Sequence, residues 1–395
     1  MALPNVNIII GNGGLGRIAA TNDSVCGIIL SGVAVAGKIA VSEPKQIFAL
    51  EEAVALGLDA AYDTANSLKA YKHIRDFYSQ APSGTPLWIM LVPAATLMAD
   101  IVDTTLTQAK KLLDAASGNI RMLGITRVPP GAYAPVITQG IDPDVIAALP
   151  KAQALAAEYA AAYRPFRCLL EGRAFDGNPG TLYNLRAGTQ NRVGVVIGQT
   201  EATGKCAAVG LALGRFARVP VQENIGKVKR GELGLLNAYF TDNKAISEYN
   251  IGAWAQISDK GYIFMRSYPG RNGFYFNDDH AATALTDDYY SLANGRVIDK
   301  VASLAYATYV EEILSELVLD EEGKISPALA RYYESLLERV LTLQMVNNGE
   351  LSATSAEMDA NQNILVTSKL AIRSGNVPVA YARNIEVTLQ LVNPR

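Results

Sequence analysis

Hydrophobic residues recur with two different periods along this chain, and their alternation predicts its architecture. Between residues 21 and 250, short apolar runs that suit buried strands alternate with segments whose apolar residues recur at helical spacing. The predicted strands are Val25–Val35, Leu87–Val92, Ile120–Val128, Arg167–Glu171 and Val193–Ile197. The predicted helices are Glu43–Leu58, Ala65–Tyr78, Asp103–Ala115, Pro143–Tyr163 and Ala207–Ala217. This order predicts a mixed α/β fold with a largely parallel sheet covered by helices.

The region after residue 260 is predicted as a hairpin that leads into a long helix. Tyr262–Arg266 and Phe274–Asn277 are aromatic-rich strand candidates joined across Pro269–Gly273. Within this connection, Asn272–Gly273 suits the positive φ angles of a tight turn. Thr286–Asp288 then offers an N-terminal cap. One face of the following helix is apolar, with Val297, Val301, Leu304, Ala305, Ile313 and Leu317. The other face is charged, with Asp299, Lys300, Glu311 and Glu312. The apolar stripe requires a neighbouring element to cover it.

Another helix and a strand are predicted before the C-terminus. Ser326 caps a helix that starts at Pro327 and is closed by Asn347–Gly349. Ile364–Arg373 then alternates as a strand, which Ser374–Pro378 breaks.

Both ends of the chain show the period-two alternation of a strand. Near the N-terminus the apolar positions are Val6, Ile8 and Ile10, and the glycine-rich segment Gly11–Gly16 follows as a flexible joint. Within Asn384–Leu391 the apolar positions are Ile385, Val387, Leu389 and Leu391. An unpaired strand exposes a row of backbone donors and acceptors that favours pairing with another chain. The pattern alone leaves two interpretations open: these strands close the chain's own sheet, or they exchange with a neighbouring chain.

Composition favours a protein that buries surface against other copies. Apolar residues make up 49% of the 395 residues and charged residues 18%, which predicts a large core and apolar surface to be covered by oligomerisation. The net charge is −3 and no long Lys/Arg block occurs. We therefore expect no direct contact with nucleic acid as the main role.

Cysteine content and the N-terminal sequence bear on the compartment. Cys26, Cys168 and Cys206 are odd in number and widely spaced, so we expect a reducing compartment and no disulfide framework. The N-terminus lacks the pattern of a signal peptide, and no run of about 18 apolar residues is present to span a membrane. These features predict a protein of the cytoplasm, without membrane insertion.

Two glycine-rich segments suggest nucleotide binding, and neither fits well. Gly11, Gly13 and Gly16 have dinucleotide-binding spacing, but the segment after them is short and polar and opens no amphipathic helix. The segment Gly198–Cys206 lies between a predicted strand and a predicted helix, as a phosphate loop would. It has five residues between its glycines where the motif has four, and Cys206 stands where a Ser or Thr hydroxyl would bind Mg²⁺. A nucleotide-binding α/β enzyme therefore remains an alternative interpretation, and a solvated loop is favoured.

Candidate metal and catalytic residues are few. His73 and His280 have no ligand or base partner at helical spacing. Asp278, Asp279 and His280, with Asp287 and Asp288, could hold a divalent ion, yet an acidic segment before an apolar stripe is typical of a helix cap. We predict no catalytic residue, no metal and no cofactor.

Several segments resemble a known family. Gly261–Arg266, Gly273–Asp278, Asp287–Asp288 and Arg296–Asp299, with the upstream segments Gly210–Arg215 and Pro220–Gly226, are similar to segments of contractile tail sheath proteins. These are the subunits of phage tails and related contractile injection machines. The resemblance covers most of the chain, and sheath subunits use N- and C-terminal arms to augment a sheet in neighbouring subunits. It therefore favours strand exchange over closure of the chain's own sheet.

The resemblance implies a structural subunit without enzymatic activity. We expect it to polymerise as a helical stack of rings, hexameric in form, around an inner tube protein, and to contact baseplate and tail-end proteins. Assembly is expected in the bacterial cytoplasm, with the mature protein in a virion tail or injection particle. The expected domains are an N-terminal arm (1–20), an α/β region (21–250), a C-terminal sheath domain (251–378) and a C-terminal arm (379–395). A non-contractile structural oligomer is the other alternative.

Overall fold

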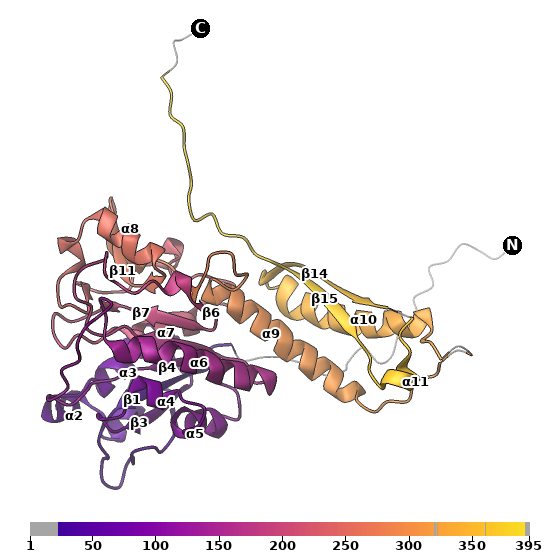
Figure 1. The fold of residues 1–395 in the computed structure, drawn as a ribbon, viewed down its shortest axis with the longest axis horizontal. Helices are drawn as coiled ribbons and strands as arrows, with labels where there is room; N and C mark the ends of the chain where they lie inside the picture. Colours follow the sequence, from indigo (N-terminus) through magenta and orange to yellow (C-terminus); the bar gives the residue numbers. More distant parts are fainter. Residues whose placement is uncertain (1–22, 320, 322, 360, 392–395) are drawn as a thin grey trace, which may run out of the picture.

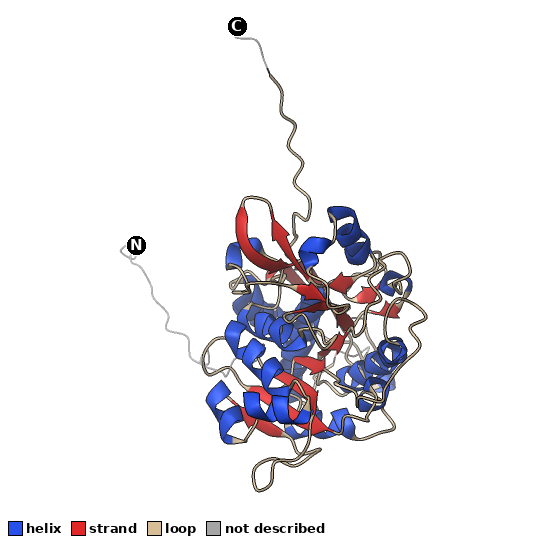
Figure 2. Cartoon of the chain, turned by 90° about the vertical axis from the view of Figure 1, so that its left-hand side faces the viewer, coloured by secondary structure: helices blue, strands red, loops and turns tan. Residues whose placement is uncertain are grey.

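A computed structural model describes residues 23–319, 321, 323–359 and 361–391. Figure 1 shows a large α/β body, which we call the body, joined by one long helix to a smaller layer of helices and strands. The body takes up residues 23–291. The smaller layer, called here the C-terminal layer, takes up residues 292–378 and includes the long connecting helix. A C-terminal arm then stands clear of both parts (Figure 1 and Figure 2).

A seven-stranded sheet forms the centre of the body, with strand order β10-β7-β5-β4-β1-β3-β2. Its strands are β1 (Cys26–Ser31), β2 (Lys45–Ile47), β3 (Leu87–Val92), β4 (Met122–Ile125), β5 (Arg167–Glu171), β7 (Val193–Val196) and β10 (Tyr262–Ile263). All neighbours pair in parallel except β2, which is antiparallel to β3. The predicted largely parallel sheet is confirmed. Its central strands are buried on both faces, which explains their continuous apolar sequences.

Helices cover both faces of this sheet. The helices of the body are α1 (Leu50–Ala55), α2 (Ala60–Asn66), α3 (Ala70–Gln80), α4 (Met98–Ile101), α5 (Gln108–Ala115), α6 (Pro143–Ala161), α7 (Val209–Arg218) and α8 (Ile251–Asp259). Single 3₁₀ turns lie at Leu185–Ala187, Val228–Arg230 and Ile246–Glu248. Helix α6 starts where the sequence predicts, because Pro143 occupies its first turn and the Asp142 side chain accepts a hydrogen bond from the Asp144 N–H.

Three short antiparallel pairs extend the body. They are β6 (Thr189–Gln190) with β13 (Ala282–Thr283), β8 (Gly198–Gln199) with β9 (Tyr239–Phe240), and β11 (Met265–Tyr268) with β12 (Arg271–Phe276). The last pair is the predicted aromatic hairpin, but its turn lies at Pro269–Gly270, because Tyr268 pairs with Arg271. The placement of the turn at Asn272–Gly273 was therefore wrong.

The C-terminal layer packs two helices against a two-stranded sheet. Its elements are α9 (Leu292–Tyr309), a 3₁₀ turn (Val310–Glu312), α10 (Pro327–Leu341), a π-helical turn (Thr342–Val346), β14 (Leu351–Met358), α11 (Ile364–Thr367) and β15 (Ile372–Pro378). Leucines of α10 and valines of α9 share one core with Leu351 and Ala356 of β14. The neighbour that the apolar stripe of α9 requires is thus α10 together with this sheet. The helix ends at Tyr309, so the extension of the predicted stripe to Ile313 and Leu317 was wrong. Ser326 caps α10 as predicted, because its side chain accepts from the Leu329 N–H.

Three further predicted segments were wrong. The segment predicted as the helix Glu43–Leu58 contains β2 and α1, because Lys45–Ile47 pairs with the edge of β3. The predicted helix Ala65–Tyr78 is divided at Ser67, whose φ of 54° is left-handed. The predicted strand Ile364–Arg373 begins as helix α11, because the Asn363 side chain caps it by accepting from the Val366 N–H. The strand starts only at Ile372, and its partner β14 was not predicted.

Two glycines allow α3 and α7 to pack unusually closely. A Cβ added at Gly210 would lie 2.1 Å from the carbonyl oxygen of His73, and one added at Gly214 would lie 2.2 Å from that of Phe77. Both oxygens belong to the backbone of α3, so no side-chain rotation relieves the overlap. The helices must therefore separate to accept any side chain at these positions.

We predict that Gly214→Ala lowers the free energy of unfolding. Alanine gains up to about 1 kcal/mol in helix propensity over glycine, but overpacking against the α3 backbone costs about 1–3 kcal/mol or more. Chemical denaturation of the mutant and parent chains measures the difference. Gly131→Ala is the matched control, because a Cβ there meets nothing within 4 Å. Equal stability of the Gly214→Ala and parent chains would contradict the close packing described here.

Candidate assembly interface

Helix α9 is fixed to the body by a buried ion pair. Arg167 of β5 donates from Nε to Asp299 Oδ2 at 2.6 Å and from Nη2 to Asp299 Oδ1 at 3.0 Å, and Arg192 Nη1 donates to the same Oδ1 at 3.0 Å. The Arg167 guanidinium also donates to the carbonyl oxygen of Gly295 at 2.8 Å, within the first turn of α9. A side chain at Gly295 would collide with this guanidinium. The arginine therefore connects the central sheet to the start of the helix.

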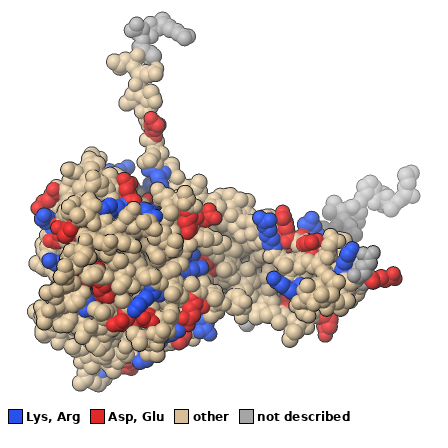
Figure 3. Space-filling model, viewed as in Figure 1, with Lys and Arg blue, Asp and Glu red and all other residues tan. Residues whose placement is uncertain are grey.

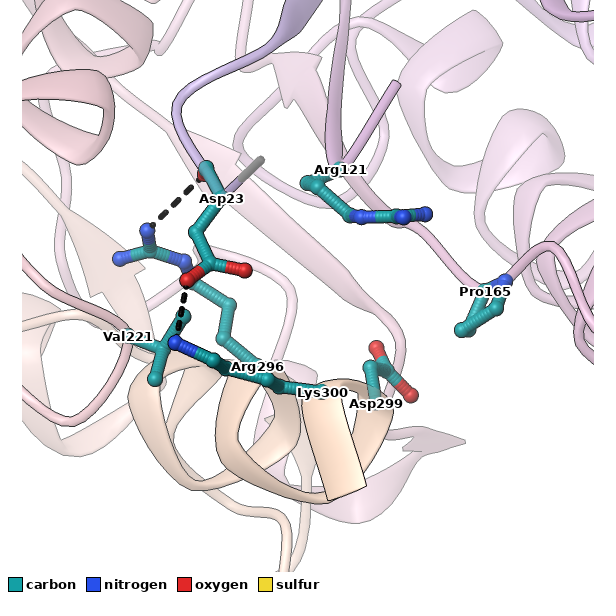
Figure 4. A pocket seen from close by; sticks show the side chains of 7 residues that line it. All are labelled: Asp23, Arg121, Pro165, Val221, Arg296, Asp299 and Lys300. Atoms are coloured by element: carbon teal, nitrogen blue, oxygen red, sulfur yellow. Dashed lines mark hydrogen bonds and ion pairs between the residues drawn. The ribbon is translucent and has the colours of Figure 1, made fainter. Parts of the chain in front are cut away.

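Two further charged residues of α9, Lys300 and Arg296, connect the helix to other segments of the chain. Lys300 Nζ lies 2.6 Å from Asp23 Oδ2 and 2.7 Å from Glu350 Oε2, just before β14. Arg296 donates to the carbonyl oxygens of Phe216 and Val219 at the end of α7. Figure 4 shows Arg296 and Lys300 converging on Asp23 beside a small pocket. The prediction that Asp299 and Lys300 form an outer charged face was wrong, because both are buried in ion pairs.

Ser291 is the N-cap residue of α9, and the carboxylate of Asp279 accepts the capping hydrogen bond that the Ser291 side chain does not make. Asp279 Oδ2 accepts from the Ala293 N–H at 2.8 Å and Asp279 Oδ1 from the Ser291 hydroxyl at 2.9 Å. Burial, together with the neighbouring Asp278, raises the pKa of Asp279 well above its ordinary value. The segment Thr286–Asp288 does not cap the helix. Asp287 instead caps a local turn, where its Oδ1 accepts from the Tyr289 N–H.

The C-terminal arm is attached to the body before it leaves. The Tyr381 hydroxyl donates to the carbonyl oxygen of Gln222. Arg383 Nη2 lies 3.1 Å from Asp278 Oδ1, and its guanidinium lies over the ring of Tyr290, 4.7 Å from the centroid. Sequence reasoning missed both attachments, because the partners are about 100 residues away or more. The arm therefore has an anchored root, Tyr381–Arg383.

Beyond Arg383 the arm is exposed and apolar at alternate positions. The exposed fractions are 80% for Ile385, 69% for Val387, 88% for Leu389 and 105% for Leu391. Figure 3 shows this segment standing clear of the rest of the surface. Such a row of exposed large aliphatic side chains is typical of an interaction segment. The segment has no ladder partner within the described chain, so its pairing with a neighbour stays a prediction. Val6, Ile8 and Ile10 lie outside the described residues.

The sheet β14–β15 has the form of an acceptor for such a strand. Its inner face packs on α10 through Leu351, Ala356 and Met358, which are buried, whereas Ala353, Ser355 and Glu357 on the other face are exposed. No third strand pairs with either edge among the described residues. Two strands alone make a marginal sheet, and further strands would stabilise it.

The loop Gly198–Cys206 does not present a phosphate site. The Ala207 N–H, which lies just before α7, donates to Glu171 Oε1 at 3.0 Å. The Arg127 N–H donates to the other carboxylate oxygen, Glu171 Oε2, at 2.6 Å. A protein carboxylate thus occupies the position of an anion. Burial raises the pKa of Glu171 to about 7, and Arg173 opposes that shift. Cys206 is buried, and burial raises the pKa of its thiol to about 12.

The remaining candidates for metal or acid–base chemistry lie in structural positions. Burial lowers the pKa of His73 to about 3 and that of His280 to about 4, so both are neutral at physiological pH. His280 Nδ1 contacts Arg186 Nη2 at 2.5 Å. Among the residues that the structure describes, no three acidic, cysteine or histidine side chains gather in a metal-binding arrangement. The three cysteines are free and buried. Within the same residues, no helix is long and apolar enough to cross a bilayer.

The fold is that of the sheath subunits of contractile injection systems. The sheath of the anti-feeding prophage (AFP) in its contracted state is similar over 99% of both chains, with a TM-score of 0.66 and 14% identity. The sheath complex of PVC, an extracellular contractile injection system, in its contracted state has a TM-score of 0.63 and 11% identity over 99% of this chain and 98% of that one. A chain of the AFP baseplate has a TM-score of 0.63, 13% identity and 99% coverage of both chains.

Sequence comparison assigns the chain to a family. Models of the N-terminal and C-terminal domains of DUF2586 match residues 3–280 and 288–395, so the protein belongs to the DUF2586 family. A search of curated proteins finds no significant match.

We predict that Lys205→Ala leaves folding unchanged and removes no nucleotide binding. Lys205 is exposed, and its described hydrogen bonds involve only its backbone: its N–H donates to the Asn243 side chain at 3.2 Å, and its carbonyl oxygen accepts from the Ala174 N–H at 3.4 Å. Thermal melting of the mutant should match that of the parent chain, and calorimetric titration of either with MgATP or MgGTP should give no binding signal. Binding by the parent that the mutation abolishes would establish the alternative of a nucleotide-binding protein.

Proposed function

We propose that this protein is the sheath subunit of a contractile injection machine. It polymerises as a helical stack of hexameric rings around an inner tube, contacts baseplate and tail-end proteins, and drives the tube through a target envelope when the sheath contracts. The observation that carries this proposal is the whole-chain similarity to the contracted AFP sheath. Assembly takes place in the bacterial cytoplasm, and the mature subunit resides in a tail or injection particle.

The exposed arm supports a polymer in which subunits exchange strands. Its four alternating aliphatic side chains have no cover in the single chain. On the proposed reading, residues 384–391 add to a sheet of a neighbouring subunit, and so does the N-terminal strand with Val6, Ile8 and Ile10. The proposed division of the chain is an N-terminal arm (1–20), an α/β region (21–250), a sheath domain (251–378) and a C-terminal arm (379–395).

The proposed work is mechanical. An extended lattice shortens and widens, and the arms keep subunits connected while the rigid parts reorient. The charge network on α9 supports this, because it connects the body, Asp23 and the start of β14 to one helix. Each subunit can then turn as one body. The proposal includes no catalytic site and no cofactor.

We predict that the purified protein forms hollow striated tubes without nucleotide or metal. Negative-stain electron microscopy in the presence of a chelator tests this directly. Closed shells would favour a non-contractile oligomer, and discrete soluble particles would favour an enzyme. Tubes that dissolve on chelation or nucleotide removal would reveal a ligand site in the assembly.

We also predict that the arm stabilises the polymer and not the fold. In Val387→Lys/Leu389→Lys, charge replaces two aliphatic side chains that are exposed in the single chain, so thermal melting should stay close to that of the parent. Tubes should fail to form, because each buried aliphatic side chain contributes about 1.5–3 kcal/mol and each backbone hydrogen bond about 1 kcal/mol net. Deletion of Asn384–Arg395, or of Met1–Ile10, should have the same effect.

Thr388→Lys/Gln390→Lys is the matched control for the arm. It adds the same charge to the opposite side of the same strand, where the sequence is already polar. Tubes should still form with this variant. If the aliphatic-side variant unfolds, the strand belongs to the chain's own core. If that variant assembles normally, other contacts hold the polymer together.

A further inference from the structure

The two edges of the sheet β14–β15 differ in the groups that cover them. On β14, the Ala356 N–H donates to Glu338 Oε1 at 2.8 Å, and the Met358 N–H donates to Glu334 Oε1 at 2.7 Å. Both glutamates belong to α10. Alternate N–H groups of a strand point to the same edge, so these two donors lie on the edge of β14 that faces away from β15.

The edge of β15 has no such cover. Ser374 and Asn376 are the register partners of Ala356 and Thr354, so their backbone N–H groups point away from β14. Within the described chain no side chain accepts from either N–H, and the Asn376 side-chain amide itself donates to the Ser374 hydroxyl at 3.0 Å. One edge of the sheet is therefore open, and the other has two charged acceptors in the place of a neighbouring strand's carbonyl oxygens.

We propose that Glu334 and Glu338 close the β14 edge in the free subunit and release it to a strand supplied by a second copy of the chain. This inference rests on the proposed function. A carboxylate is a strong acceptor for a backbone N–H, and an edge strand that is covered in this way resists unspecific pairing. The glutamates thus make one edge available only to a strand that replaces both hydrogen bonds.

The strand that binds the β14 edge comes from a second copy of the chain, because the arm of each subunit is held away from its own sheet. Only residues 379–383 separate β15 from the arm, a length that would allow a hairpin back onto β15. Tyr381 and Arg383 instead hold this connection on Gln222 and Asp278 of the body. The arm therefore leaves the sheet (Figure 1), and its predicted strand, Asn384–Leu391, has eight residues, as β14 does.

One of the two glutamates, Glu334, already has a second partner that it can keep when it leaves the β14 edge. Arg331 Nη1 lies 2.6 Å from Glu334 Oε2, and the Arg331 side chain is 81% exposed. When a strand takes over the Met358 N–H, Glu334 can rotate outward and keep this arginine. The charge then moves toward water and is not left buried without a partner.

Amide hydrogen exchange of the unassembled subunit tests the closed edge directly. In dilute full-length protein, the Ala356 and Met358 amides should be protected, and the Ser374 and Asn376 amides should exchange fast. Glu334→Ala/Glu338→Ala should abolish the protection at Ala356 and Met358 without changing Ser374 and Asn376. Glu334→Gln/Glu338→Gln is the matched control, because a glutamine oxygen still accepts the hydrogen bond. Fast exchange at Ala356 and Met358 in the parent chain would overturn the proposal.

Assembly supplies the second readout. Loss of the two glutamate contacts destabilises the free subunit and not the polymer. The lowest subunit concentration that forms tubes should therefore fall about thirtyfold in the double alanine variant, as expected for two hydrogen bonds of about 1 kcal/mol net each. The glutamine variant should assemble like the parent. If the alanine variant and the parent form tubes at the same lowest subunit concentration, the release step is wrong. Glu338→Ala alone, at a half-buried position, gives the same test should the double variant fold poorly.

The two readouts separate this inference from the proposed function. A protein that never polymerises but shows protected Ala356 and Met358 amides retains the closed edge and refutes the sheath proposal, and with it the release step. A protein that forms tubes but shows no such protection keeps its sheath function and loses the inference.

Discussion

The structure depends on the buried charges of one helix turn in α9. Arg296, Asp299 and Lys300 are all buried, and each connects the helix to a different part of the chain. Removal of one partner from a buried ion pair lowers the free energy of unfolding by about 3–5 kcal/mol, because the remaining charge is buried without a partner and without water. Such pairs contribute less to net stability than to geometry, since few alternative packings satisfy every charge at once. They therefore fix the angle between the body and the C-terminal layer.

This fixed angle gives the exposed arm its significance. The root of the arm binds Asp278, and the adjacent Asp279 caps α9, so the direction of the arm is set at the same place as the start of the connecting helix. Any rotation of the body therefore carries the exit point of the arm with it. In a polymer joined by exchanged strands, that coupling transmits the movement of one subunit to the next without a change inside either one.

The sequence predicts best those elements whose residues satisfy each other locally. The bounds of β3 and β5 agree with the predicted strands, because a strand buried on both faces is a continuous apolar run. Helix α6 was predicted because Asp142 and Pro143 mark its start. The aliphatic alternation of Ile385, Val387, Leu389 and Leu391 likewise indicated a strand that needs a partner, and these side chains are exposed in the single chain.

The features that sequence could not predict all join groups far apart in the chain. Asp299 and Lys300 have the pattern of a solvated face, and only the fold brings Arg167 and Asp23 to them. Glu334 and Glu338 likewise have the spacing of a polar helix face. Their carboxylate oxygens nevertheless accept hydrogen bonds from N–H groups of β14, about 20 residues later. A charged side chain at helical spacing is read as exposed unless its partner is known. In this protein the buried charged residues determine how the layers are connected. The apolar pattern therefore predicts the layers of the fold, whereas the connections between them depend on polar contacts that only the three-dimensional structure reveals.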